Sequence, residues 1–181
     1  MSYYDVDAIL TDSQKLPCTF ELDVPGLGYL EGNVGGMVKA GTKIDLPMWL
    51  GIMLAVSTGN APDSSQLVTL DFPTPLQQRV INALKADPRT VDLRAQAPHF
   101  YALGARIMEL FDDTAVLDTL INTFKMRAAE IADQAHNPRG ALGDGAEFLR
   151  GLDETERQLF KAAHEGPKAV RAWTQDLKKI T

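Results

Sequence analysis

The spacing of hydrophobic residues along the chain changes near residue 73. Before this point, short apolar segments with imperfect alternation are separated by glycine- and proline-containing turns, as in a small sheet. After it, apolar residues recur every three or four positions, as on one face of a helix. The sequence therefore predicts an α+β protein, in which a small β-rich domain, residues 1–73, precedes a mainly helical domain, residues 74–181, folded as a helix bundle.

Within the first domain, the pattern predicts four short strands and one buried helix. The helix begins after Pro47, a residue suited to a first helical turn, and it is apolar on most sides from Met48 to Leu54. The Pro25–Gly28 segment is typical of a turn. The strands are expected at residues 19–24, 29–30, 42–46 and 67–72.

The second domain is predicted to contain five helices. The first begins at Thr74-Pro75, an N-cap and first-turn pair, and ends before Asp87-Pro88. A second helix starts near Pro98, and a third is capped by Asp113 or Thr114. After a loop expected to be mobile at 137–145, a fourth helix is predicted at 147–164. Gly166-Pro167 is expected to separate it from a final helix that carries Trp173.

The composition favours a protein that neither reads DNA sequence nor spans a membrane. Its 181 residues carry a formal net charge of -6, whereas a protein that grips duplex DNA usually presents a basic surface. The single cysteine, Cys18, cannot form an internal disulfide, which favours a reducing compartment. The acidic N-terminus is unlike a signal peptide, and the longest apolar run, 46–56, is about half of the roughly 20 residues that a bilayer requires.

No motif in the sequence assembles an active site, a cofactor site or a metal site. Gly26-Leu27-Gly28 resembles the start of a dinucleotide-binding loop, but the next glycine is one position late and no helix pattern follows. The three histidines are isolated from one another and from Cys18. We therefore expect a non-catalytic protein with no cofactor and no metal.

The acidic residues near position 153 allow two interpretations. The favoured one places Asp153, Glu154 and Glu156 on a solvated helix face, paired with Arg150 and Arg157. The other is a small hydrolase that uses Asp153 with Glu156, or Cys18, and it predicts a perturbed pKa or a reactive thiol in a cleft. For Cys18, a packed small hydrophobe is the favoured interpretation.

Several stretches in a fixed order resemble one protein family. They run from the N-terminus to Trp173, and each is weak alone but specific in combination. Together they make the chain similar to the third Psf subunit of GINS, the four-subunit replication complex of eukaryotes, and most similar to its fungal form. The stretches are Tyr3–Leu10, Leu16–Cys18, Pro25–Glu31, Lys43–Leu50, Ala86–Pro88 with Val91–Leu93, Pro98–Tyr101 and Leu152–Arg157.

The resemblance implies a fold and a function. It implies a small β-rich B domain followed by a helical A domain, without catalytic residues or cofactors. It implies a nuclear scaffold subunit of the GINS heterotetramer, whose partners are the other three GINS subunits, the second Psf subunit being the closest. Through the complex, it implies association with the MCM helicase ring, with the RecJ-like Cdc protein and with DNA polymerase epsilon, in the active replicative helicase. No membrane and no direct sequence-specific DNA binding are implied.

Six apolar residues within or near these stretches are candidates for the partner interface, although each could instead belong to the core. Aromatic residues contribute a disproportionate share of interface energy, which is why most of the six are aromatic. The alternative function is a helical adaptor with an appended β unit that is unrelated to replication. The six candidates are Trp49, Leu93, Phe100, Tyr101, Phe160 and Trp173.

Overall fold

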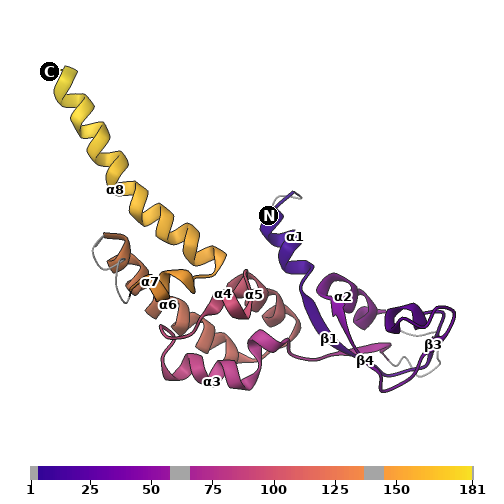
Figure 1. Cartoon of the computed structure of the whole chain (residues 1–181). Helices are drawn as coiled ribbons and strands as arrows, with labels where there is room; N and C mark the ends of the chain where they lie inside the picture. Colours follow the sequence, from indigo (N-terminus) through magenta and orange to yellow (C-terminus); the bar gives the residue numbers. More distant parts are fainter. Residues whose placement is uncertain (1–3, 58–65, 137–144, 181) are drawn as a thin grey trace. The chain divides into compact units, whose positions relative to one another are not determined.

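A computed structural model describes residues 4–57, 66–136 and 145–180 of the chain (Figure 1). The chain forms two compact units, Met1–Thr74 and Pro75–Thr181. The first unit holds a small antiparallel sheet and the second a bundle of helices, which confirms the predicted α+β class.

The first unit is built on a three-stranded antiparallel sheet in the order β4-β1-β5. The strands are β1 (Lys15–Phe20), β4 (Lys43–Pro47) and β5 (Val68–Leu70). In the register, Leu16 pairs with Leu46 and Cys18 with Leu70, so these apolar side chains share one face of the sheet. Helix α2 (Met48–Val56) covers that face, with Gly51 against the Cys18 side chain. A two-stranded ribbon joins β2 (Val24–Pro25) to β3 (Met37–Val38).

Several details of this unit differ from the sequence prediction, among them strand β3, which was not predicted. Helix α1 (Val6–Asp12) was not predicted, although Asp5 caps it by accepting hydrogen bonds from the Asp7 and Ala8 amides. The first strand lies four residues earlier than expected, at β1. The strand predicted at 29–30 is instead a 3₁₀ helix, η1 (Gly28–Glu31), because the Gly28 amide bonds to the Gly36 carbonyl and folds the segment into a compact loop.

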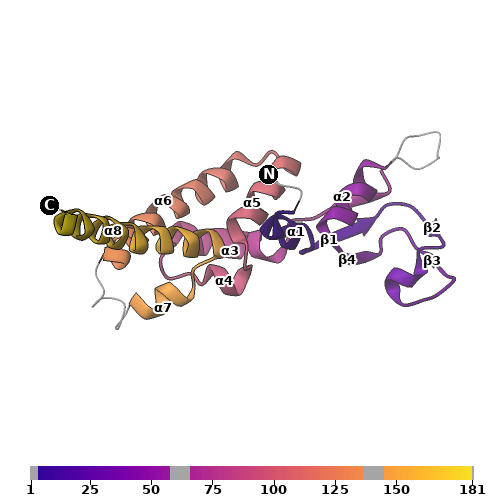
Figure 2. The same cartoon turned by 90° about the horizontal axis from the view of Figure 1, so that it is seen from above.

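The second unit packs its helices around the long helix α6 (Thr114–His136) (Figure 2). Helices α3 (Gln78–Ala86), α5 (Phe100–Leu110) and α8 (Glu154–Ile180) all pack against α6. The shorter helices are η2 (Thr74–Leu76), α4 (Leu93–Gln96) and α7 (Gly145–Arg150). The core is formed by side chains such as Ile81, Leu103, Ile107 and Ile131, each almost completely buried.

The last two predicted helices are wrong in their boundaries. The predicted helix at 147–164 is two helices, α7 and α8, because the chain turns at Gly151 and restarts after Asp153. The expected break at Gly166-Pro167 is absent, and α8 continues through Pro167. A proline inside a helix removes one backbone hydrogen bond, but the preceding Gly166 has no Cβ to clash with the proline ring. Apart from Gly145, the loop predicted to be mobile lies outside the described residues.

Candidate partner interface

Helix α2 carries an apolar stripe on the side that faces away from the sheet. Trp49, Met53 and Val56 are spaced at i, i+4 and i+7, and all three are more than half exposed. On the opposite side of the helix, Met48 is fully buried and Gly51 contacts the sheet. The α2 stripe is therefore accessible in the isolated chain.

A second apolar surface lies between α5 and α6. The two helices approach closely at Gly104, where a Cβ atom would lie 2.9 Å from a methyl carbon of Leu120. Beside this contact is a hollow of about 380 Å³, called the α5–α6 groove below. Leu117 and Ile121 are each 42% exposed at the groove. Its apolar lining also includes Tyr101, Met108, Leu120 and Phe124.

A buried arginine stabilises the turns that connect the helices of this unit. Arg127 of α6 is fully buried and donates five hydrogen bonds. Its Nε and Nη2 atoms lie 2.7 and 2.8 Å from the two carboxylate oxygens of Glu156. The other bonds go to the carbonyls of Pro88, Val91 and Gly151. One side chain thus connects α6 to the turn before α4, the turn after α7 and the start of α8.

The partner carboxylate, Glu156, also helps to start α8. The Glu156 amide donates to Asp153 Oδ1 at 2.8 Å, and the Asp153 amide donates to Glu156 Oε2 at 3.4 Å. This reciprocal pair is a capping box, which satisfies amides that a helix start leaves free. The Tyr101 hydroxyl donates to Glu156 Oε1 at 2.9 Å. The four groups form what we call the Arg127 network: Arg127, Glu156, Asp153 and Tyr101.

Burial shifts two pKa values in this network. It raises the pKa of Asp153 from 3.8 to about 6, against the hydrogen bonds from the Glu156 and Tyr101 amides, which lower it. Burial and the neighbouring Glu156 carboxylate raise the pKa of Tyr101 well above its ordinary value.

The solvated acidic face predicted around residue 153 is wrong for two of its three carboxylates. Asp153 and Glu156 are fully buried, because α8 begins against α5 and α6 rather than in solvent. Only Glu154 fits the prediction, with an exposed contact of 3.8 Å to Arg157. Both buried carboxylates are occupied by hydrogen bonds within the Arg127 network. This disfavours Asp153 and Glu156 as a catalytic acid–base pair.

The six predicted interface residues fall into three environments. Leu93 and Phe100 are fully buried in the helical core, so no partner reaches them in the folded chain. Tyr101 and Phe160 are partly exposed, and Tyr101 lines the α5–α6 groove. Trp49, on the α2 stripe, is 54% exposed, and Trp173, on α8, is 65% exposed. The surfaces of these four remain candidate contact sites, one in the first unit and three in the second.

The sequence did not indicate that Arg127 is buried. It also did not indicate that Leu117 and Ile121 are exposed contact residues. Arg127 lies within the buried stripe of α6, four residues before Ile131, where an apolar residue is expected. A single charge inside an apolar stripe signals a buried partner, since an unpaired buried charge is very costly. Leu117 and Ile121 carried no such signal, because their exposure depends on how closely α5 approaches.

The structure also disfavours Cys18 as a nucleophile. The thiol is buried within the sheet, and burial raises its pKa to about 11, so it stays protonated and shielded from substrates. Among the described residues, no group of histidine, cysteine and acidic side chains is placed to hold a metal ion. None of the described helices is both long enough and apolar enough to cross a bilayer.

Comparison with known proteins relates both units to one family. Residues 4–56 match the family model described as the PSF3 N-terminal domain, and residues 75–175 match the GINS complex protein helical bundle domain. The chain is 67% identical over 179 residues to the DNA replication complex GINS protein psf3 of Aspergillus fumigatus, covering 99% of both chains. It is 36% identical over 173 residues to the protein of the same name in Schizosaccharomyces pombe, covering 96% of this chain and 97% of the other. The chain therefore belongs to the Psf3 family of GINS complex proteins.

Proposed function

We propose that this chain is a non-catalytic scaffold subunit of a nuclear GINS heterotetramer that acts in chromosomal DNA replication. In this proposal, residues 1–73 form the B domain and residues 74–181 the A domain. The observation that carries it is the match of both units to GINS families, together with relatives named as DNA replication complex GINS proteins. The exposed α2 stripe and α5–α6 groove support it, because permanent subunit interfaces are rich in apolar surface.

The proposed partners are the other three GINS subunits, with the second Psf subunit closest. The assembled tetramer then joins the MCM ring and its RecJ-like Cdc partner into the active replicative helicase and contacts DNA polymerase epsilon. A scaffold of this kind favours one shape of the motor only by binding that shape more tightly than the alternatives. Its contribution is binding energy and geometry, which requires apolar contact surface rather than catalytic side chains.

The first test is reconstitution of the tetramer. The chain is co-expressed with the other three subunits of a fungal GINS complex and analysed by size-exclusion chromatography with light scattering. We expect one peak with the mass of one copy of each subunit. A stable monomer that elutes apart from the three would contradict the proposal.

A single substitution tests the α5–α6 groove as part of that interface. Ile121→Glu places a carboxylate in the groove, where an apolar partner cannot solvate it, so we expect the tetramer peak to be lost. The matched control is Asn122→Glu, which adds the same charge at an exposed neighbouring position that does not line the groove. Circular dichroism checks that both variants stay helical. If a folded Ile121→Glu chain assembles as well as the control, the groove is not a subunit interface.

A second experiment tests the scaffold role itself. DNA unwinding is measured with the MCM ring and the RecJ-like protein, with the full tetramer or with the three subunits lacking this chain. We expect unwinding to require this chain, while the chain alone hydrolyses no ATP and unwinds no DNA. Full unwinding in its absence would refute the role.

A further inference from the structure

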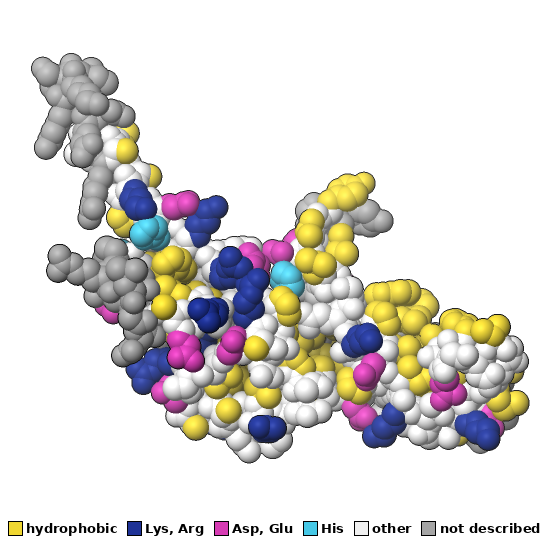
Figure 3. All heavy atoms as spheres, viewed as in Figure 1, with side chains coloured by type: hydrophobic (Ala, Val, Ile, Leu, Met, Phe, Trp, Pro, Cys, Tyr) yellow, Lys and Arg dark blue, Asp and Glu magenta, His cyan; other side chains and the backbone are white. Residues whose placement is uncertain are grey.

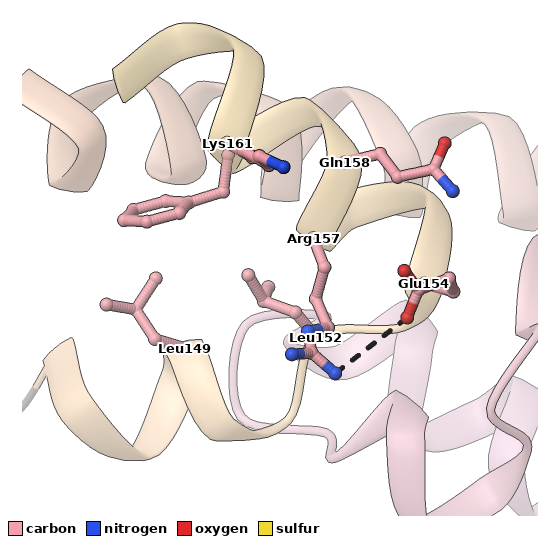
Figure 4. A pocket seen from close by; sticks show the side chains of 7 residues that line it. Leu149, Leu152, Glu154, Arg157, Gln158 and Lys161 are labelled. Atoms are coloured by element: carbon pink, nitrogen blue, oxygen red, sulfur yellow. Dashed lines mark ion pairs between the residues drawn. The ribbon is translucent and has the colours of Figure 1, made fainter. Parts of the chain in front are cut away.

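A groove between α7 and α8 combines an apolar floor with a basic rim. Its hollow measures about 460 Å³, and the described residues that line it all lie between positions 149 and 161. The floor consists of Leu149, Leu152 and Phe160, of which Leu152 is almost fully buried. Figure 4 shows the Leu149 side chain of α7 directed toward α8, with Arg157 and Glu154 beside Leu152. We call this hollow the α7–α8 groove.

The rim of the groove carries more positive than negative charge. Arg157 and Lys161 line it, and both are exposed. Among the described lining residues Glu154 is the one carboxylate, and its contact with Arg157 is long, at 3.8 Å, and solvent-exposed. Such a pair contributes little and is easily exchanged for another partner. Figure 3 shows the basic side chains gathered over the first turns of α8, next to apolar surface.

The Arg127 network holds this groove in shape. Arg127 donates to the carbonyl of Gly151, in the turn between α7 and α8, and its guanidinium carbon lies 4.7 Å from the ring centre of Phe148 in α7. The Glu154 amide donates to the Pro98 carbonyl at 2.9 Å, which ties the start of α8 to the segment before α5. Both walls are therefore fixed before any ligand arrives, and a pre-formed site loses little conformational entropy on binding.

We propose that the α7–α8 groove binds an acidic peptide segment with an apolar anchor residue, supplied by a protein outside the GINS tetramer. A hollow of this size accommodates one or two anchor side chains of a short segment. Carboxylates of the segment pair with Arg157 and Lys161 while the anchor contacts Leu149 and Phe160. A charged rim suits a transient partner, since charge complementarity accelerates association and permanent interfaces are more apolar.

The chemistry of the groove favours a peptide over nucleic acid. Its floor is mostly aliphatic, and a nucleic-acid strand binds best where aromatic side chains stack with successive bases along a basic path.

The test uses two labelled peptide pools of about twelve residues. Each has a central tryptophan and randomised spacer positions, with either glutamate or lysine at the remaining positions. Binding is followed by fluorescence anisotropy to the full-length chain and to the reconstituted tetramer. We expect the acidic pool to bind both preparations, more weakly as salt is raised, and the basic pool to bind neither. An acidic pool with alanine in place of tryptophan should bind much less.

Charge reversal locates the site. Arg157→Glu with Lys161→Glu should weaken binding of the acidic pool about tenfold or more. The control, Arg79→Glu with Lys85→Glu, changes the net charge equally at exposed positions of α3 and should leave binding unchanged. Equal effects of the two double variants, or no preference for the acidic pool, would overturn the proposal. Binding to the chain but not to the tetramer would mean that a sister subunit fills the groove. Displacement of the peptide by a single-stranded oligonucleotide would identify a nucleic-acid site. Either result would also overturn the proposal.

Discussion

The two units of the chain differ in charge and in how they bury polar groups. Residues 1–74 contain nine acidic residues, three lysines and no arginine, so they carry the whole net charge of -6. Residues 75–181 contain fifteen acidic and fifteen basic residues. The first unit buries an apolar sheet face beneath one helix, whereas the second includes a fully buried ion pair in its core. The second unit therefore has no net charge, yet it depends more than the first on one specific ion pair.

This difference has a physical origin in the two architectures. A sheet satisfies its backbone groups through the strand ladder and needs only an apolar cover. The helical unit contains tight turns whose carbonyls face inward, at Pro88, Val91 and Gly151, and Arg127 supplies donors to all three. We expect the stability of the helical unit to depend on one charged side chain. The stability of the sheet unit should depend instead on its buried apolar volume.

The largest expected effect is on the Arg127 network. Arg127→Met should lower the free energy of unfolding by about 3–5 kcal/mol, because it leaves Glu156 buried without its partner and three carbonyls without a donor. Urea denaturation followed by circular dichroism measures the change. The double variant Arg127→Met with Glu156→Gln should recover part of the loss, since no unpaired charge remains. A loss below about 1 kcal/mol in the single variant would show that the buried pair is dispensable.

The next effect tests the apolar core of the first unit. Leu16→Ala opens a cavity beneath α2 and should cost about 3 kcal/mol. The chain has two tryptophans, so Trp173→Phe leaves Trp49 as a fluorescence probe on α2. In that background, we expect the Trp49 transition to move to lower urea while the helical signal keeps its midpoint. A common shift of both signals would instead mean that the two units unfold together.

The smallest effect concerns the pH dependence of the helical unit. The pKa of Asp153 is raised in the folded state, so the folded chain holds this proton more tightly than the unfolded chain. Its charged form therefore destabilises the fold above about pH 6, and this penalty is relieved as the pH falls from 6 to 4. Relative to Asp153→Asn, which keeps a capping side chain but does not titrate, the native chain should gain about 2 kcal/mol over that interval.

The measurement is a series of urea denaturations of both proteins across that pH range. Because carboxylates remote from residue 153 titrate equally in the two proteins, the difference between them reports on Asp153 and its immediate neighbours. A difference that stays constant with pH would show that Asp153 titrates normally in the folded chain.

The family and the main elements of the fold could be predicted from local features of the sequence. The start of α6 after Asp113 and the end of α3 before Asp87-Pro88 depend on neighbouring residues only, since caps and prolines act within one helical turn. The change in hydrophobic period near residue 73 is likewise readable from the chain, because 3.6-residue and two-residue spacings are properties of single elements. The fixed order of the matching stretches likewise indicates the family from the sequence.

Burial and pairing were decided by tertiary structure alone. Phe100 and Tyr101 are adjacent in sequence, yet one is fully buried and the other borders a groove, because α6 and α8 cover different sides of α5. Asp153 and Glu156 had the sequence pattern of a solvated helix, but Arg127, twenty-nine residues before Glu156, makes their burial tolerable. Local sequence determines where an element begins and ends. Which of its faces meets water depends on chain segments far away, whose contacts no short pattern encodes.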